Sequence, residues 1–312
     1  MNKSSKIYVA GHKGLVGSAI VRNLTKSGYF NLVLRSKDEV DLTDAKETRK
    51  FFETEKPEYV FIAAAKVGGI LANDTYPADF IRENLAIQNN IFESAHRYKV
   101  KKLLFLGSSC IYPADCPQPI KEEYFLTGPL EQTNIAYAIA KIAGVIECQS
   151  YHRQYGCNFI SVMPTNLYGP NDNFNPETSH AFPAILSKIH NAKASGAPEL
   201  KLWGTGKPKR EFLFVDDLAD ALLFLMNNYD GPEIINIGTG EDISIADFVE
   251  LVKKIIGFDG QVKWDKSKPD GTIRKQLDVS KLHALGWKHK TELQEGIKIV
   301  YDWFLNNVAN KT

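Results

Sequence analysis

The feature that most constrains the fold of this chain is the alternation of short apolar runs with longer amphipathic stretches over its first 165 residues. Short β-branched and aromatic runs are typical of buried strands, and the stretches between them are long enough for helices. This rhythm predicts an α/β fold with a doubly wound, parallel sheet of the Rossmann type. The predicted strands are "KIYVA" (6–10), "NLVLR" (31–35), "EYVFIAA" (58–64), "KKLLFLG" (101–107) and "NFISVMP" (158–164).

The texture of the sequence changes after Pro164, where "NLYGPNDNFNPETSH" predicts a loop that leaves the sheet. Two later runs, "EFLFV" (211–215) and "EIINIG" (233–238), are predicted to return to it. The helical stretch 244–256 and the C-terminal segment are expected to form a smaller α/β lobe. We therefore expect a first domain over residues 1–165, completed by strands near 211–238, and a second lobe made mainly of residues 166–312, with a cleft between them.

Three glycines directly after the first predicted strand indicate a nucleotide site. Gly11, Gly14 and Gly17 form a G-x-x-G-x-x-G pattern that leads into a helix. Glycine there allows a tight turn and a close backbone approach to a pyrophosphate, which the helix N-terminus stabilises. The pattern is weak alone, but its position between a strand and a helix favours a dinucleotide cofactor.

Positive charge replaces the acid that an NAD site would carry after the second strand. A carboxylate at that place binds the ribose diol of NAD and repels a 2′-phosphate. In this sequence Arg35 and Lys37 occupy that position, and Lys13 lies in the glycine loop, so NADP(H) is the expected cofactor. The alternative is that Lys13 and Lys37 are only solvated. Asp41 and Leu42 fall where the edge of an adenine could be held.

The stretch "YAIAK" indicates catalytic chemistry. On a helix, Tyr137 and Lys141 share one face, where the ammonium favours phenolate and is expected to lower the pKa of the tyrosine. The same spacing occurs by chance as a surface pair. Here it accompanies a glycine turn and the serine-containing loop "FLGSSCIYP" after the fourth strand.

The composition argues against several classes of binding partner. The formal net charge is +1, so no overall field attracts nucleic acid or anionic lipid, and no apolar run reaches the roughly 20 residues that span a bilayer. The N-terminus lacks an apolar signal core. Four cysteines show neither metal-ligand spacing nor the density of a disulfide scaffold. We expect a cytoplasmic protein with free thiols, no metal, no nucleic acid and no membrane contact.

Together these motifs resemble the extended short-chain dehydrogenase/reductase superfamily and, within it, the GDP-L-fucose synthase family. The narrower resemblance implies a bifunctional enzyme that epimerises GDP-4-keto-6-deoxy-D-mannose at C3 and C5 and reduces it at C4 with NADPH. Leu15 and Lys13 depart from the residues most common in that family, without altering the expected chemistry. The motifs are "AGHKGLVGSAIVR", "AAAKVGGILAN", "LGSSCIYP", "MPTNLYGPNDNF", "SHAFPA", "LWGTGKPKREFLFVDD" and "PDGTIRKQLDVSKL".

The resemblance also implies roles for individual residues. Cys110 and His180 would exchange the C3 and C5 protons, while Ser108, Tyr137 and Lys141 would serve the reduction. The bland alternatives are that Cys110 is a small buried hydrophobe and that His180 caps a helix. The implied substrate contacts are Lys188, Trp203, Arg210, Asp270 and Lys275. The implied cofactor site comprises Gly11, His12, Lys13, Gly14, Leu15, Val16, Gly17, Arg35, Lys37, Asp41, Leu42, Leu106, Gly107, Ser108, Ser109, Lys141, Pro164, Thr165, Asn166, Leu167 and His180.

Two other functions remain open on the sequence. One is another nucleotide-sugar reductase or 4-epimerase of the superfamily, the latter retaining its NAD; the other is a cofactor-sensing binding protein, which would typically lack Tyr137 or Lys141. The resemblance further implies a homodimer formed by the helices near residues 84–97 and Tyr137.

Overall fold

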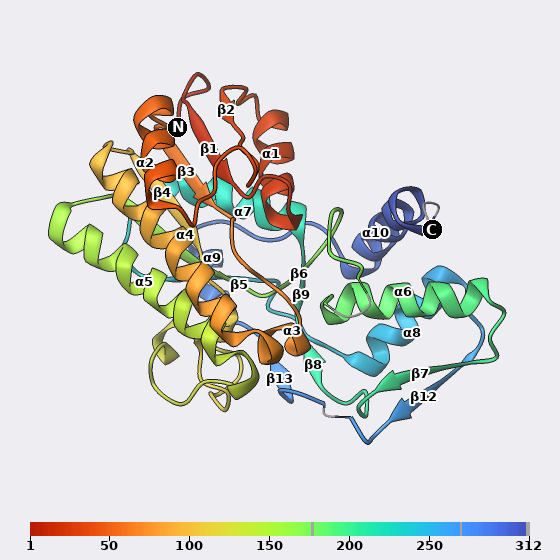
Figure 1. Ribbon diagram of the computed structural model, residues 1–312. Helices are drawn as coiled ribbons and strands as arrows, with labels where there is room; N and C mark the ends of the chain where they lie inside the picture. Colours follow the sequence, from red (N-terminus) through yellow and green to blue (C-terminus); the bar gives the residue numbers. More distant parts are fainter. Residues whose placement is uncertain (176–177, 269, 310–312) are drawn as a thin grey trace.

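The computed structural model describes residues 1–175, 178–268 and 270–309, and it has a larger and a smaller lobe (Figure 1). The larger lobe is built on a six-stranded sheet in the order β2–β1–β3–β4–β5–β10, with every neighbouring pair parallel. The predicted doubly wound parallel sheet is confirmed. Its strands are β1 (Ile7–Ala10), β2 (Leu32–Val33), β3 (Tyr59–Ile62), β4 (Lys102–Leu106), β5 (Phe159–Pro164) and β10 (Ile235–Ile237).

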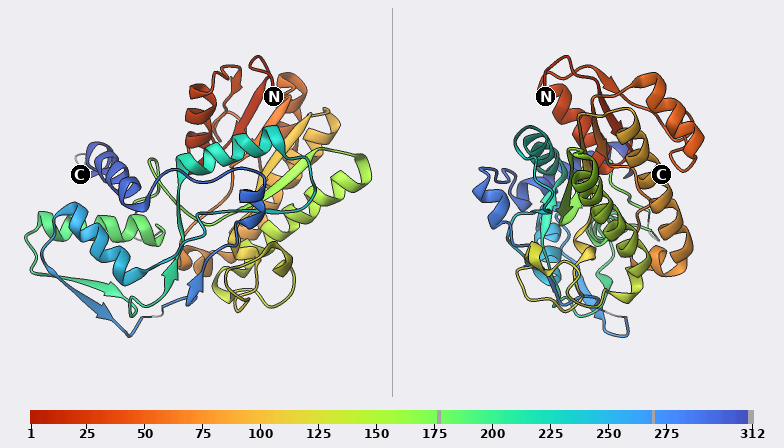
Figure 2. Two further views of the ribbon diagram at one scale, coloured as in Figure 1. Left: turned by 180° about the vertical axis from the view of Figure 1, so that it is seen from behind. Right: turned by 90° about the vertical axis from the view of Figure 1, so that its left-hand side faces the viewer.

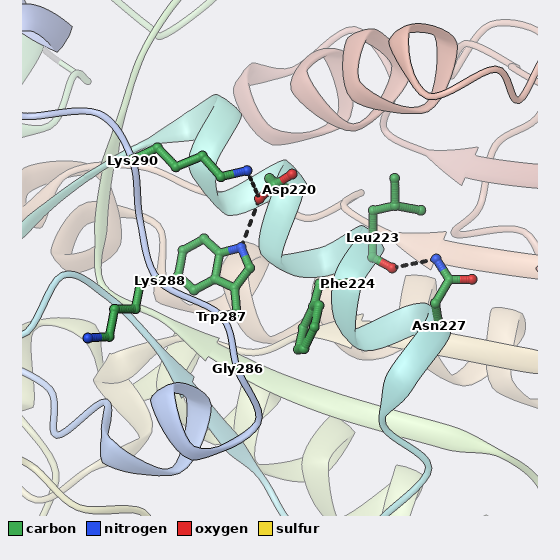
Figure 3. A pocket seen from close by; sticks show the side chains of 8 residues that line it. All are labelled: Asp220, Leu223, Phe224, Asn227, Gly286, Trp287, Lys288 and Lys290. Carbon is green, nitrogen blue, oxygen red and sulfur yellow. Dashed lines mark hydrogen bonds and ion pairs between the residues drawn. The ribbon is translucent and has the colours of Figure 1, made fainter.

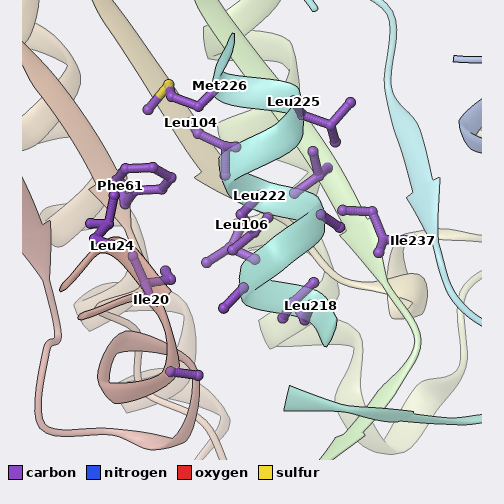
Figure 4. Close-up of a cluster of buried hydrophobic side chains, with 14 of the residues drawn as sticks. Ile20, Leu24, Phe61, Leu104, Leu106, Leu218, Leu222, Leu225, Met226 and Ile237 are labelled. Atoms are coloured by element: carbon purple, nitrogen blue, oxygen red, sulfur yellow. The ribbon is translucent and has the colours of Figure 1, made fainter. Parts of the chain in front are cut away.

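Helices cover both faces of this sheet, which explains why its strands are apolar throughout. Ile7 and Val9 of β1 belong to one buried cluster, and Tyr8 and Ala10, which point the other way, belong to a second. Figure 4 shows the first cluster, where leucines of one helix meet side chains of the sheet. This face carries α1 (Leu15–Lys26) and α7 (Val215–Asn228), and the opposite face carries α2 (Ala45–Glu55), α4 (Pro77–Arg97) and α5 (Ile135–Tyr155).

One predicted strand pairs differently from our expectation. The run 233–238 supplies β10 of the large sheet, but β9 (Phe212–Phe214) pairs with β6 (Asn166–Tyr168) in a separate two-stranded sheet. The prediction that 211–215 joins the main sheet is therefore wrong. The reason is that β10 occupies the edge of β5, so β9 pairs instead with the segment that leaves β5 towards the smaller lobe.

The smaller lobe packs three helices around an aromatic centre and lies to one side of the larger lobe (Figure 2). The ring of Phe182 lies 4.3 Å from that of Tyr168 and 5.2 Å from that of Phe248, measured between centroids. The expected helix at 244–256 is present from Ile245, with Ser244 as its N-cap. The lobe comprises α6 (Ala181–Ala194), α8 (Ile245–Ile256) and α10 (Leu293–Asn307), with β7 (Glu199–Trp203) beside β12 (Gln261–Asp265), and β8 (Lys209–Arg210) between β11 (Ile243–Ser244) and β13 (Arg274–Lys275).

Part of the C-terminal segment returns to the larger lobe. Helix α9 (Ser280–Ala284) packs beside β10, and Leu282 and Trp287 are buried in the core beneath α7. Between β3 and α4 the chain forms the short helix α3 (Ile70–Thr75). Within the described residues, no helix is both long and apolar enough to cross a membrane. Short 3₁₀ turns lie at Ser109–Ile111, Glu122–Tyr124 and Gln132–Asn134.

Candidate active site

The glycine turn after β1 has the shape that a dinucleotide requires. Gly11 has φ +81°, and a Cβ there would lie 2.7 Å from the backbone nitrogen of Ala64. A Cβ on Gly17 would lie 2.1 Å from the carbonyl oxygen of Gly11, so helix α1 packs directly on the turn. Gly14 is the N-cap of α1, and no side chain caps the amides that follow it. A cradle of bare backbone at a helix N-terminus fits a pyrophosphate.

One of the three predicted cations already has a partner. The Nη2 atom of Arg35 lies 2.6 Å from Oε1 of Glu55. Lys13 and Lys37 are exposed. The Arg35 side chain is thus about one third exposed to solvent, and its ion pair with Glu55 fixes it to the end of α2.

Charges from the turns after β1 and β2 act on the same carboxylate. Hydrogen bonds from Ser36, followed by the charges of Arg35 and Lys13, lower the pKa of Glu39. The two turns therefore lie side by side, as the proposed phosphate site needs. Further along, the carboxylate of Asp41 accepts hydrogen bonds from the backbone and the hydroxyl of Thr43.

Tyr137 and Lys141 lie on α5 with the ammonium directed at the end of β4. Lys141 is buried, its Nζ donates to the carbonyl oxygen of Leu106 at 2.8 Å, and it lies 5.7 Å from the centre of the Tyr137 ring. Burial lowers the pKa of Lys141 to about 8. Burial also raises the pKa of Tyr137, against a hydrogen bond to Ser108 that lowers it. The expected lowering of the Tyr137 pKa is therefore not found in this structure, because desolvation and the neighbouring Cys110 raise the pKa of the phenol and only Ser108 opposes them.

Cys110 sits in the 3₁₀ turn that follows β4, next to the same group of side chains. Its side chain is 7% exposed, and its backbone amide donates to Oγ of Ser108 at 3.3 Å. Burial raises the pKa of the Cys110 thiol, whereas Lys275, Ser108 and Lys141 each pull it down. Ser108, Cys110 and Lys141 are thus brought together.

His180 approaches from the smaller lobe. It is the N-cap residue of α6, as the bland reading foresaw, yet its ring makes no capping hydrogen bond. The residue is exposed at the surface, and desolvation, followed by the charge of Lys275, lowers the pKa of His180. The charge of Lys275 therefore acts on both His180 and Cys110.

The remaining predicted substrate residues gather on the smaller lobe. Trp203 is 60% exposed, and Nζ of Lys188 lies 5.4 Å from its ring centre. Asp270 accepts hydrogen bonds from the amide and the hydroxyl of Thr205 at 2.6 and 2.7 Å. Burial lowers the pKa of Arg210, and the charge of Asp270 opposes this. An aromatic face, two cations and a carboxylate therefore share one region.

Comparison with known proteins places these features in a family. Residues 7–238 match the model of the NAD dependent epimerase/dehydratase family. The chain is 58% identical to GDP-L-fucose synthase 1 of Arabidopsis thaliana, over 99% of this chain and 96% of that protein. It is 51% identical to the GDP-L-fucose synthase of Escherichia coli strain K12, over 97% of each.

The chain belongs to the GDP-L-fucose synthase branch of this family. Among solved structures, a GDP-L-fucose synthetase from Naegleria fowleri bound to NADP is similar with a TM-score of 0.92 at 32% identity, over 99% of this chain and 96% of that one. The resemblance expected from the sequence motifs is thereby confirmed.

In this member of the GDP-L-fucose synthase family, Glu211 is a site-building residue that the sequence analysis missed. Its carboxylate is fully buried and accepts backbone hydrogen bonds from Thr239, Gly240 and Leu277 at 2.6 to 2.8 Å. Glu211 therefore ties the strand of Arg210 to the segment that carries Lys275. A lone carboxylate at the start of the apolar run "EFLFV" was the available signal.

The other predicted cofactor residues lie at the carboxyl ends of the parallel strands, where ligands bind in such sheets. Gly107 packs closely there, because a Cβ would lie 2.5 Å from the sulfur of Met163 and would force that side chain to move. His12 has a buried Nδ1 atom with no hydrogen-bond partner among the described residues. The group comprises His12, Leu15 and Val16 after β1, Leu42 after β2, Leu106, Gly107 and Ser109 at β4, and Pro164, Thr165, Asn166 and Leu167 at β5 and β6.

A surface pocket of about 390 Å³ lies away from these residues, between α7 and residues 286–290 (Figure 3). Trp287 and Lys290 both donate to Oδ2 of Asp220 there, at 2.9 and 2.8 Å. None of the predicted site residues lines it. Within the described parts of the chain, no group of three or more His, Cys, Asp or Glu side chains could hold a metal ion.

Proposed function

We propose that this protein is a bifunctional epimerase/reductase that converts GDP-4-keto-6-deoxy-D-mannose to GDP-L-fucose with NADPH. The observation that carries the proposal is the group of Ser108, Cys110 and Lys141 at the end of β4, with the Tyr137 ring beside Lys141. The charge of Lys275 acts on both Cys110 and His180. Similarity to GDP-L-fucose synthases over nearly the whole chain supports it.

The cofactor fits the bare glycine turn and the cations around it. The amides at the start of α1 would hold the pyrophosphate, and Lys13, Arg35 and Lys37 would hold the 2′-phosphate. Asp41 and Leu42 would lie beside the adenine. When bound, NADPH supplies the hydride that reduces C4.

Epimerisation relies on two proton-transfer groups. The C4 ketone acidifies the protons on C3 and C5, so a base can remove each one and an acid can return it to the opposite face. Burial keeps Cys110 a thiol and His180 a neutral imidazole in the resting site. One member of such a pair can accept a proton while the other donates one, and the charge of Lys275 favours the thiolate when it forms.

Reduction relies on the other three side chains. Tyr137 gives its proton to the oxygen at C4, and its raised pKa means that the phenol holds this proton until the oxyanion develops. Ser108 donates a hydrogen bond to the same oxygen, and the positive charge of Lys141 stabilises the tyrosinate that remains.

The smaller lobe binds the nucleotide. Lys188 and Arg210 pair with the diphosphate, Asp270 accepts from the ribose hydroxyls or the base edge, and Trp203 offers an aromatic face.

We also propose that the protein works as a cytoplasmic homodimer. The four cysteines are free, as in a reducing compartment. On α5, Ile139 and Ile146 are both at least 40% exposed and lie two helical turns apart, on one face. Such an apolar face suits a second copy of the same helix pair.

The function is tested by incubating the protein with NADPH and GDP-4-keto-6-deoxy-D-mannose in heavy water. We expect stoichiometric loss of NADPH absorbance and GDP-L-fucose that carries deuterium at C3 and C5. In Cys110→Ser, whose hydroxyl hardly ionises at neutral pH, exchange should fall by orders of magnitude while reduction of the unepimerised ketone survives. Turnover of a nucleotide sugar without net NADPH loss would instead indicate a 4-epimerase. Unchanged exchange in Cys110→Ser would remove the thiol from the mechanism.

A further inference from the structure

The loop between β3 and α3 reaches from the larger lobe to the segment that precedes His180. The backbone amide of Gly69 donates to the carbonyl oxygen of Thr178 at 3.1 Å. Figure 1 shows α3 at the end of the large sheet, beside the start of α6. This contact links the two lobes within three residues of the imidazole.

The backbone of Gly69 lies so close to residues 178–180 that no side chain fits between them. A Cβ at this position would lie 2.8 Å from the carbonyl oxygen of Ser179, which is closer than real side chains approach. The dihedral angles of Gly69 are φ −67° and ψ −179°, so an alanine could adopt the backbone without strain. Space against Ser179, rather than conformation, is therefore the reason for glycine.

Two buried asparagines hold the loop, Asn84 from helix α4 and Asn73 from α3, the helix that directly follows the loop. Asn84 of α4 accepts from the amide of Lys66 and donates to the carbonyl oxygen of the same residue, both at 3.0 Å. Asn73 of α3 donates to the carbonyl oxygens of Gly68 and Gly69 at 2.8 and 3.0 Å. Since buried amide hydrogen bonds leave few alternative arrangements, the place of Gly69 is set by the larger lobe.

The ring of His180 lacks any such support from its own helix. It makes no capping hydrogen bond at the start of α6, so its position relative to Cys110 depends on the backbone of residues 178–180. We propose that Gly69, fixed by Asn73 and Asn84, is a positioning residue that sets the distance between His180 and the Cys110 side of the site. This proposal rests on the proposed function of His180 in proton exchange.

The test is the variant Gly69→Ala, read out as deuterium exchange into GDP-4-keto-6-deoxy-D-mannose without NADPH. Displacement of the Ser179 carbonyl should slow exchange on the order of tenfold to a hundredfold, as expected for an acid/base group that is misplaced by about 1 Å. Binding of NADPH, measured by fluorescence titration, should stay close to that of the parent. The matched control is Gly68→Ala, whose Cβ would meet side-chain atoms of Ala72 and Phe80 and not the backbone of residues 178–180. Its exchange rate should stay close to that of the parent.

A double-mutant cycle separates positioning from general damage. In a His180→Gln background, Gly69→Ala should cause no further loss of exchange, because the group that it misplaces is already absent. If Gly69→Ala does not fold, Asn73→Asp replaces the donor to both loop carbonyls by an acceptor and should give the same non-additive loss.

Three results would overturn the proposal. The first is an exchange rate in Gly69→Ala equal to that of the parent, and the second is a loss of exchange that adds to the loss in His180→Gln. Either result would show that Gly69 does not position His180, while the proposed function would still stand. A parent protein without any exchange would remove the proposed function itself.

Discussion

At the scale of single residues, burial sets the protonation states of the site and a few cations oppose it. The pKa of Cys110 is raised by desolvation, and Lys275 is the first of the groups that lower it. We therefore predict that Lys275→Met, which keeps the length of the side chain and removes its charge, raises the thiol pKa further. The rate of Cys110 alkylation by iodoacetamide, followed by peptide mass spectrometry, should then rise only at higher pH than in the parent.

Lys207→Met, a change of the same kind at an exposed position, is the control and should leave this profile in place. An unshifted profile in Lys275→Met would show that the charge of Lys275 does not affect the thiol.

The sequence could indicate Tyr137 and Lys141 together, because helical spacing is local. It could not reveal that Lys275 faces Cys110, because only the fold brings these residues together.

At the scale of elements, the apolar runs predicted the six strands of the large sheet and their burial on both faces, because period and length are local signals. The pairing of β9 with β6 was not predictable, since an apolar run does not specify which strand edge is free to receive it. The helix predicted over 244–256 begins within one residue of its expected start, because helical spacing is a local signal.

The packing of α5 beside α4 carries a pH-dependent cost that no sequence motif signals. Burial raises the pKa of Glu147 on α5 to about 7. Between the ordinary pKa of a glutamate and this value, the native state holds a proton that the unfolded state has lost, so stability should fall as pH rises from about 4.5 to 7. Glu147→Gln should remove this part of the decline, measured as the urea midpoint at pH 5, 6 and 8. Glu123→Gln, at an exposed carboxylate, should keep it, and equal slopes in Glu147→Gln and the parent would contradict the assignment.

At the scale of the whole molecule, the change in composition after Pro164 indicated that a smaller lobe follows the first five strands. The sequence did not indicate which later segments belong to the larger lobe. Leu282 and Trp287, which lie far along the C-terminal segment, complete the core of that lobe beneath α7. The proposed site follows this division, because Cys110 and Tyr137 belong to the larger lobe, whereas His180 and Arg210 belong to the smaller one.

The face of α5 that carries Ile139 and Ile146 leads to a prediction about assembly. In a twofold-symmetric dimer each substitution occurs twice, so the variant Ile139→Glu/Ile146→Glu places four charges in one interface. At about 1 kcal/mol for each partly exposed isoleucine, the loss is about 4 kcal/mol, or roughly a thousandfold in the dissociation constant. Sedimentation at micromolar concentration should show a dimer for the parent and a monomer for this variant. Phe30→Glu, at a side chain that is 74% exposed elsewhere on the larger lobe, should stay dimeric. A monomeric parent, or a double variant that still sediments as a dimer, would exclude this face as the interface.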